Sequence, residues 1–93
     1  MRLYPQVPFN LRCAVEETTL PRGGGPAGLD PILVRAGDTI CFSTYTMHRR
    51  KDIWGLDADE FIPARWEGDL PGAELAYLPF NTGPRACIGR KFC

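Results

Sequence analysis

The chain has 93 residues, of which 44% are apolar, and its 11 Lys and Arg residues balance 11 Asp and Glu residues. This apolar share excludes a disordered tail. The neutral balance gives no reason to expect nucleic acid or an anionic membrane surface as a partner. Ten glycines and nine prolines are spread along the chain, which disfavours long uninterrupted helices. A loop-rich chain with short strands is therefore predicted.

Strands are predicted in the first half of the chain, separated by proline- and glycine-containing segments. Residues 6–10 should be extended, because proline fixes its own φ and restricts the residue before it. Leu11–Val15 alternates apolar and polar residues, which favours a short strand. Thr18–Pro21 and Pro31–Val34 are predicted to be two further strands, joined by the glycine-rich segment Arg22–Asp30. That segment has no phosphate-binding pattern.

One more strand and one short helix are predicted before the chain becomes irregular. Asp38–Ser43 has the β-branched and aromatic residues of a strand. Thr44–Arg50 could form one or two helical turns, with Thr44 as the N-cap. Glu67–Ala76 contains glycine and proline and is expected to be irregular. No run approaches the roughly 20 apolar residues that cross a bilayer.

The cysteines and the single histidine do not have the spacing of a zinc site or of a disulfide scaffold. The cysteines are Cys13, Cys41, Cys87 and Cys93. They lie far apart with no C-x-x-C pair. No signal peptide is visible at the N-terminus. His48, as a lone histidine, is interpreted as a structural hydrogen-bonding residue rather than a metal ligand or a general base.

The stretch from residue 80 to residue 89 carries the most specific pattern of the chain. It reads F-x-x-G-x-R-x-C-x-G, with Phe80, Gly83, Arg85, Cys87 and Gly89 at the fixed positions. This pattern resembles the haem-binding loop of the cytochrome P-450 (haem-thiolate monooxygenase) family. The alternative is a buried structural cysteine in a Gly/Pro turn, the ordinary role of an isolated cysteine, which the flanking residues disfavour.

The resemblance implies haem b as the cofactor, with Cys87 as its metal ligand. A thiolate on the iron pushes electron density to the haem and favours O–O cleavage. Gly83 and Gly89 would let the backbone pass close to the ring, with amides directed at the sulfur. Arg85 would meet a haem propionate, and Phe80 would pack beside the ring. The residues from Ile88 should begin a helix.

Two arginines match scaffold positions of the same family. Arg2-Leu3-Tyr4-Pro5 resembles the end of the E-x-x-R helix, whose glutamate would precede Met1, so residues 1–5 are expected to be its last turn. Arg65 fits the arginine of the F-x-P-E-R-[FW] run, in which Ala64 replaces the usual acid. A planar guanidinium can hold a carboxylate and backbone carbonyls together. Arg2 and Arg65 are thus expected to be structural.

The resemblance also assigns roles to the segment before the first predicted strand. Val7, Pro8, Phe9 and Asn10 would border the substrate. Arg12 matches a second arginine that binds a haem propionate. The alternative for Arg12 is an ordinary exposed cation, which is the majority case for arginine.

The expected fold class is a fragment of the mainly-α cytochrome P-450 fold. Residues 1–93 would run from the end of the E-x-x-R helix to the start of the helix after the haem loop, without forming a complete independent domain. The covered part is expected to be loop-rich, with short β-strands, a short helix and the cysteine loop.

The implied function is that of an oxidoreductase, a monooxygenase that hydroxylates apolar substrates with O2 and electrons from NADPH-cytochrome P-450 reductase. The Thr18–Asp38 region resembles the fungal branch that hydroxylates alkanes and fatty acids. The parent enzyme would lie at the endoplasmic reticulum membrane, held by an N-terminal anchor outside this chain. The fragment alone is expected to be inactive. Two alternatives are a non-enzymatic haem-binding module and a structural fragment without a cofactor.

Overall fold

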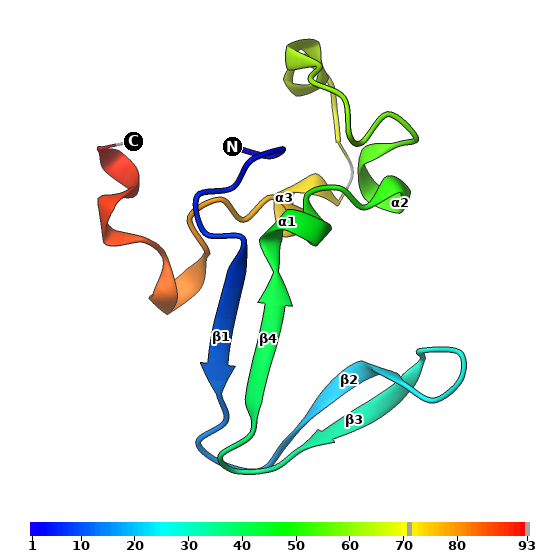
Figure 1. The fold of residues 1–93 in the computed structure, drawn as a ribbon, viewed down its shortest axis with the longest axis vertical. Coiled ribbons are helices and arrows are strands. Elements are labelled where there is room, and N and C mark those ends of the chain that lie inside the picture. Colours follow the sequence, from blue (N-terminus) through cyan, green and yellow to red (C-terminus); the bar gives the residue numbers. More distant parts are fainter. Residues whose placement is uncertain (71, 93) are drawn as a thin grey trace. The chain divides into compact units, whose positions relative to one another are not determined.

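The chain divides into two compact units in a computed structural model that describes residues 1–70 and 72–92. One unit contains Met1–Phe9 and Ser43–Cys93, and the other contains Asn10–Phe42. Cys93 itself lies outside the described residues. Figure 1 gives the element labels that are used below. Within the described residues, the helices are too short to cross a membrane.

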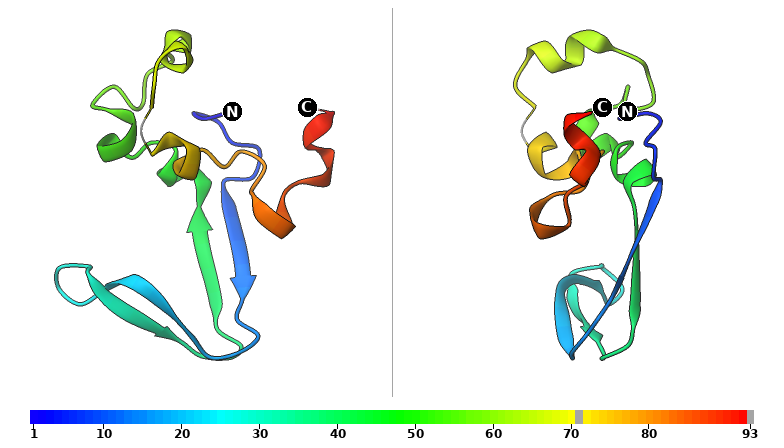
Figure 2. Two further views of the ribbon diagram at one scale, coloured as in Figure 1. Left: turned by 180° about the vertical axis from the view of Figure 1, so that it is seen from behind. Right: turned by 90° about the vertical axis from the view of Figure 1, so that its left-hand side faces the viewer.

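Four short strands make up most of the second unit. β1 (Phe9–Cys13) pairs with β4 (Thr39–Ser43), and β2 (Thr18–Gly24) pairs with β3 (Asp30–Val34). The β2–β3 pair is an antiparallel hairpin closed by a loop (Figures 1 and 2). Its register places Thr18 opposite Val34, and an irregularity follows Leu20. The predicted hairpin is confirmed, although β2 continues to Gly24.

The predicted bounds of the first strand are shifted from those of β1, whereas the predicted bounds of the last strand nearly match those of β4. β4 lies within the predicted range, whereas β1 begins and ends two residues before the predicted Leu11–Val15. β1 ends at Cys13 because the chain turns at the next residue. The Ala14 amide donates to the Asp38 carbonyl at 2.9 Å, and the Gly37 amide donates to the Ala14 carbonyl at 2.8 Å. These bonds close the connection between the two pairs of strands.

Short helices follow β4 in the first unit. They are α1 (Thr44–Met47), α2 (Lys51–Trp54) and α3 (Ala73–Ala76), with the 3₁₀ helices η1 (Pro63–Glu67), η2 (Gly83–Arg85) and η3 (Ile88–Lys91). The predicted helix at residues 44–50 is confirmed in its first turn. Its N-cap is Ser43 and not Thr44, because the Ser43 hydroxyl accepts from the Thr46 amide at 3.1 Å.

Two further sequence expectations are corrected by the backbone, and one is confirmed. Residues 1–5 contain a bend and no helical turn. The expected irregular stretch includes α3, whose Tyr77 amide bonds to the Ala73 carbonyl at 2.7 Å. The helix expected from Ile88 is present as the 3₁₀ helix η3, and the Phe92 amide bonds to the Gly89 carbonyl at 2.9 Å.

The core of the first unit lies around Trp54, whose side chain is 1% exposed. Ala58, Ala73 and Ala76 are buried against it. The Trp54 indole N–H donates to the Met47 carbonyl at 3.1 Å, which satisfies its one polar group. The small alanines let α3 approach the indole closely. This core positions the segment that leads into the cysteine loop.

Two more aromatic rings cover the exposed side of this core. Trp66 lies edge-on to Trp54 with ring centroids 5.9 Å apart, and Tyr77 lies 4.7 Å from Trp66. Such offset pairs each contribute about 0.5–1.5 kcal/mol beyond the area they bury. Burial also raises the pKa of Tyr77 above its ordinary value. The cluster joins η1 to the chain that follows α3.

Candidate functional site

The Cys87 loop is closed by one backbone hydrogen bond between its ends. The Cys87 amide donates to the Phe80 carbonyl at 2.8 Å, which encloses η2. Asn81 and Gly83 have φ values of 57° and 64°, the left-handed conformation that glycine and asparagine adopt most readily. These two residues turn the chain so that the amide of Cys87 returns to Phe80.

The Cys87 thiol is free and exposed beside an open hollow. The hollow measures about 460 Å³ and is lined by Pro84, Ala86, Cys87, Ile88, Arg90 and Lys91. Ile88 is 99% exposed and the nearby Phe92 is 93% exposed. The thiol therefore lies on a surface that combines uncovered apolar side chains with two cations.

The other predicted residues of this loop lie on the same short segment. Arg85 is in η2 and exposed, and within residues 1–70 and 72–92 it forms no ion pair with a carboxylate. Phe80 is half-buried. A Cβ on Gly89 would lie 3.7 Å from the Cys87 sulfur, an ordinary contact distance. Any larger side chain there would begin to cover the thiol.

The expected amide bonds to the sulfur are not formed. Among the described residues, no amide donates to the Cys87 sulfur. The Arg90 amide instead bonds to the Cys87 carbonyl at 3.3 Å, because η3 begins directly after the cysteine.

Arg12 and Asn10 belong to the second unit, while the cysteine loop belongs to the first. The Arg12 guanidinium lies 5.5 Å from the Phe42 ring centroid and donates to the Leu11 carbonyl at 2.8 Å. The side chain is half-buried. Arg12 is thus held against an aromatic ring of its own unit rather than extended freely into solvent.

The predicted substrate-bordering segment is fixed through its backbone, which leaves its side chains outward. The Thr44 hydroxyl donates to the Val7 carbonyl at 2.6 Å, and the Ser43 hydroxyl donates to the Pro8 carbonyl at 3.3 Å. The Val7 and Phe9 side chains are exposed. The start of α1 therefore holds a segment whose apolar side chains face solvent.

Arg2 is a buried cation that is bonded to the backbone of the first unit. It is 6% exposed and donates to three backbone carbonyls: His48 at 2.7 Å, Ala58 at 2.5 Å and Glu60 at 3.1 Å. Its guanidinium also lies 5.1 Å from the Trp54 ring centroid. The pKa of Arg2 lies below its ordinary value, first because burial desolvates the cation and then because Arg65 is close.

Arg65 binds a carboxylate and two carbonyls with one guanidinium. It donates to the Trp54 carbonyl at 2.6 Å and to the Asp57 carbonyl at 3.1 Å, and it pairs with the Asp57 carboxylate at 3.0 Å. Its Nε is buried without a partner among the described residues. Arg2 and Arg65 together hold the loop from Trp54 to Glu60.

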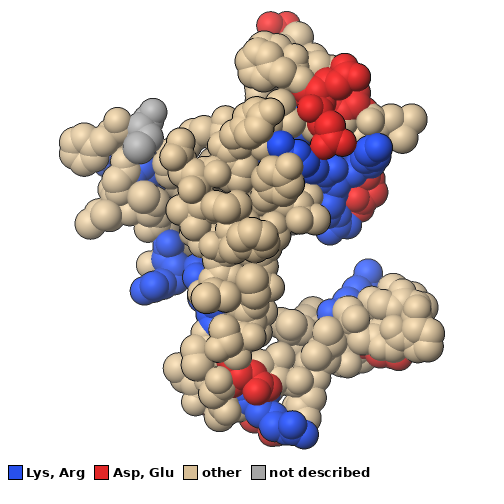
Figure 3. Space-filling model, in the orientation of Figure 1, with Lys and Arg blue, Asp and Glu red and all other residues tan. Residues whose placement is uncertain are grey.

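Basic and acidic side chains adjoin one another on part of the surface (Figure 3). Arg49 pairs with Asp59 at 3.3 Å, and Arg50 pairs with Asp52 at 2.5 Å. The Arg50 bond also holds the pKa of the Asp52 carboxyl below its ordinary value. The Arg50–Asp52 pair is exposed on both sides, whereas the Arg49 side chain is only 15% exposed. An exposed pair stabilises less than the buried arginine contacts do.

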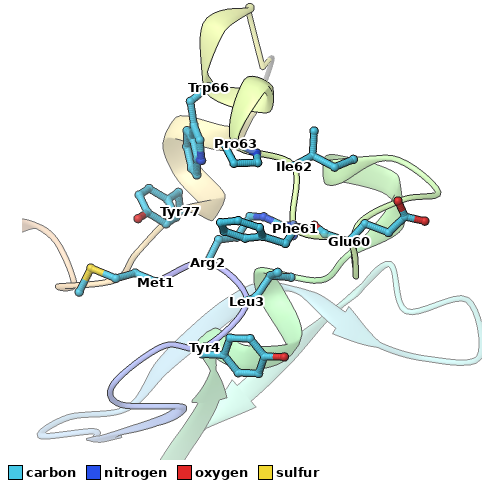
Figure 4. Close-up of a pocket in the computed structure, with 10 residues that line it drawn as sticks. All are labelled: Met1, Arg2, Leu3, Tyr4, Glu60, Phe61, Ile62, Pro63, Trp66 and Tyr77. Carbon is cyan, nitrogen blue, oxygen red and sulfur yellow. Dashed lines mark hydrogen bonds between the residues drawn. The ribbon is translucent and has the colours of Figure 1, made fainter.

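A second hollow, of about 130 Å³, lies beside Arg2. It is lined by residues 1–4 and 60–63 together with Trp66 and Tyr77 (Figure 4). The guanidinium at its edge is already bonded to three carbonyls. The donors of Arg2 therefore serve the backbone rather than the hollow.

His48 is confirmed as a structural hydrogen-bonding residue, but its partners were not predictable. Its side chain is 0% exposed. Nδ1 lies 3.2 Å from the Arg2 carbonyl, and Nε2 accepts from the Leu78 amide at 3.0 Å. Sequence reasoning missed this link to the cysteine loop, because backbone partners leave no pattern in the sequence.

Comparison with known proteins gives a match along the whole chain. A family model described as Cytochrome P450 matches residues 1–93. The cytochrome P450 monooxygenase alt2 of Alternaria solani is 58% identical over 92 residues, which cover 99% of this chain and 17% of that protein. The cytochrome P450 monooxygenase g430 of a Fusarium species is 61% identical over 99% of this chain and 16% of that protein.

A third relative, cytochrome P450 52A13 of Debaryomyces hansenii, is 52% identical over 99% of this chain and 18% of that protein. All three come from fungi. The chain therefore spans less than a fifth of the length of these relatives.

Proposed function

Because the chain belongs to the cytochrome P450 family, we propose that it forms the cysteine-ligand part of a longer haem-thiolate monooxygenase. The observation that carries this proposal is the Cys87 loop. Its thiol is free, exposed and bordered by an open hollow with uncovered apolar side chains.

The residues of this loop fit a haem. In the described part of the chain, no three His, Cys, Asp or Glu side chains gather to hold a bare metal ion. A single thiol cannot hold a bare iron ion, but it can ligate iron whose other positions are already filled by the nitrogens of a porphyrin. Bound haem supplies oxygen activation, which a thiolate ligand favours. The exposed Ile88 and Phe92 would lie close to such an apolar ring.

Each residue of the loop has a separate proposed role. Cys87 ligates the iron as a thiolate, and Phe80 shields it from water. Arg85, an exposed cation without a carboxylate partner among the described residues, binds a propionate by a charge-assisted hydrogen bond. Gly83 turns the backbone, and Gly89 keeps the face of the thiol clear.

The remaining proposed roles lie outside the loop. Arg12 binds the second propionate while its guanidinium is oriented by Phe42. Val7, Pro8, Phe9 and Asn10 border the substrate. Arg2 and Arg65 hold the scaffold through the carbonyls of residues 48–60.

The substrate class we propose is alkanes or fatty acids, with O2 as co-substrate and NADPH-cytochrome P-450 reductase as the electron donor. The exposed apolar Val7 and Phe9 side chains support an apolar substrate. We propose that the full-length enzyme lies at the endoplasmic reticulum membrane, through an N-terminal anchor outside this chain. Residues 1–93 alone should be inactive, because they span less than a fifth of the relatives.

The test is NADPH-dependent hydroxylation of fatty acids by the full-length enzyme with its reductase. Cys87→Ala should abolish turnover, whereas Cys41→Ala, which removes another exposed thiol, should leave it unchanged. Turnover that survives Cys87→Ala would refute the role of this loop. Clear turnover by residues 1–93 with added haem would refute the prediction that the fragment is inactive.

A further inference from the structure

His48 joins two segments that are 30 residues or more apart in the chain. It contacts the Arg2 carbonyl through Nδ1 at 3.2 Å and the Leu78 amide through Nε2 at 3.0 Å. No part of the side chain is exposed to solvent. The Tyr77 ring lies 5.3 Å from the imidazole, centroid to centroid, and covers it.

These two partners fix the tautomer of the imidazole. The Leu78 amide can only donate, so Nε2 must accept through its lone pair. The single proton of the neutral ring then lies on Nδ1 and faces the Arg2 carbonyl. A second proton on Nε2 would oppose the Leu78 N–H, and this hydrogen bond would be lost. The neutral ring fits both partners, whereas the imidazolium fits only one.

The charges around His48 also oppose protonation. Burial lowers its pKa below the ordinary 6.5, and the cations of Arg2 and Arg49 lower the pKa further. The hydrogen bond to the Arg2 carbonyl opposes this effect. The facing phenol of Tyr77 is neutral, since burial raises its pKa. The neutral ring is therefore the stable form in this site.

Leu78 lies at the start of the segment that shapes the cysteine loop. Its carbonyl accepts from the Asn81 amide at 3.4 Å. Two residues after Leu78, the Phe80 carbonyl accepts from the Cys87 amide at 2.8 Å. The bond to His48 therefore anchors the segment from Leu78 to Phe80, where the Cys87 loop begins.

We propose that His48 is a positioning residue for the Cys87 loop, and that it holds this loop through Leu78 only while its imidazole is neutral. The proposal rests on the proposed function, in which Cys87 ligates haem iron. His48 does not touch the iron or the thiol, so its effect passes through the Leu78 amide.

The sign of the pH dependence follows from the lowered pKa. His48 is easier to protonate in the unfolded state than in the folded state. Its neutral form therefore stabilises the fold fully at pH values above the unfolded pKa of about 6.5. That contribution is lost as the pH falls through the lower pKa of the folded state. We therefore expect the loop to loosen below pH 6.5 and to be held fully above it.

Two substitutions separate the two hydrogen bonds of the ring. In His48→Gln, the side-chain carbonyl can take the place of Nε2 and accept from the Leu78 amide. In His48→Asn, the shorter amide can take the place of Nδ1 and donate to the Arg2 carbonyl, which leaves Leu78 unbonded. Neither side chain titrates. Ser43→Ala, which removes the N-cap of α1 and keeps the imidazole of His48, is the control for general destabilisation.

The first measurement is amide hydrogen exchange at Leu78 in the full-length enzyme. We expect exchange roughly tenfold faster in His48→Asn than in wild type, as the loss of one hydrogen bond implies, and near wild-type exchange in His48→Gln. Equal exchange in wild type and both variants would overturn the proposal, as would an unprotected Leu78 amide in wild type.

The second measurement is the carbon monoxide difference spectrum of the reduced, haem-loaded full-length enzyme between pH 4.5 and 7.5. We expect the red-shifted Soret band of wild type and Ser43→Ala to weaken through a one-proton step that His48→Gln lacks. His48→Asn should show a weaker band throughout. A step that persists in His48→Gln would overturn the proposal. A missing band in wild type at every pH would instead refute the haem-thiolate function, and Leu78 exchange would still decide the role of His48.

Discussion

Replacing Arg2 by lysine tests whether the buried guanidinium holds the first unit together. Arg2 donates to the carbonyls of His48, Ala58 and Glu60 and stacks over Trp54. Lysine keeps the positive charge, but its compact ammonium cannot span three carbonyls that one planar guanidinium reaches. The substitution therefore removes hydrogen bonds to the carbonyls while it keeps the positive charge.

The expected cost follows from the number of bonds that lysine cannot make. A hydrogen bond from a charged donor contributes about 1.5–3 kcal/mol. The bond to Glu60 is only partly buried, so water can replace it. Of the two buried bonds, lysine retains one, and a weaker contact with Trp54 adds to the loss. We expect Arg2→Lys to lower the free energy of unfolding by about 2–3 kcal/mol, a large part of the roughly 5–15 kcal/mol of an ordinary domain.

The assay is urea unfolding followed by tryptophan fluorescence, because Trp54 is buried beneath this guanidinium. The matched control is Arg50→Lys, the same chemical change at an exposed ion pair with Asp52. There the loss should be much smaller, because both partners of the pair are exposed to solvent. If Arg2→Lys costs no more than Arg50→Lys, the three carbonyl contacts do not hold this unit.

Three further substitutions test individual features near the cysteine loop and α1. Gly83→Ala should lower the free energy of unfolding of the protein without haem by about 1 kcal/mol, measured by urea unfolding. The cause is backbone strain alone, because nothing lies within 4 Å of the added Cβ. An unchanged midpoint would contradict this. Gly89→Ala should leave that midpoint unchanged yet weaken haem binding in a titration, since its Cβ lies 3.7 Å from the Cys87 sulfur; equal affinity would contradict crowding. Ser43→Ala should cost about 1 kcal/mol as a lost N-cap, and a neutral result would show that α1 needs no cap.

The sequence predicted those features that depend on local residue type. The β2–β3 hairpin follows from β-branched residues on either side of a glycine-rich turn, and the structure contains it. The cysteine loop was visible because five of its ten positions are fixed by chemistry. The N-cap of α1 was predicted one residue late, because Ser43 and Thr44 are both good caps. β4 ends at Ser43, so the helix begins at Thr44 and Ser43 is the cap.

Contacts with the backbone could not be predicted, because every residue offers the same carbonyl and amide. Arg2 was expected to be structural, but nothing in the sequence indicates the three carbonyls that its donors reach. His48 was expected to form hydrogen bonds, yet nothing in the sequence indicates Leu78 as its partner. Such links depend on how distant segments pack, which no local pattern records.

The most direct test of the account is the carbon monoxide difference spectrum of the reduced full-length enzyme with and without Cys87. We predict a strongly red-shifted Soret band in wild type and in Cys41→Ala, and loss of that band in Cys87→Ala. A band that is unchanged in Cys87→Ala would mean that another group ligates the iron, and the central claim would be wrong.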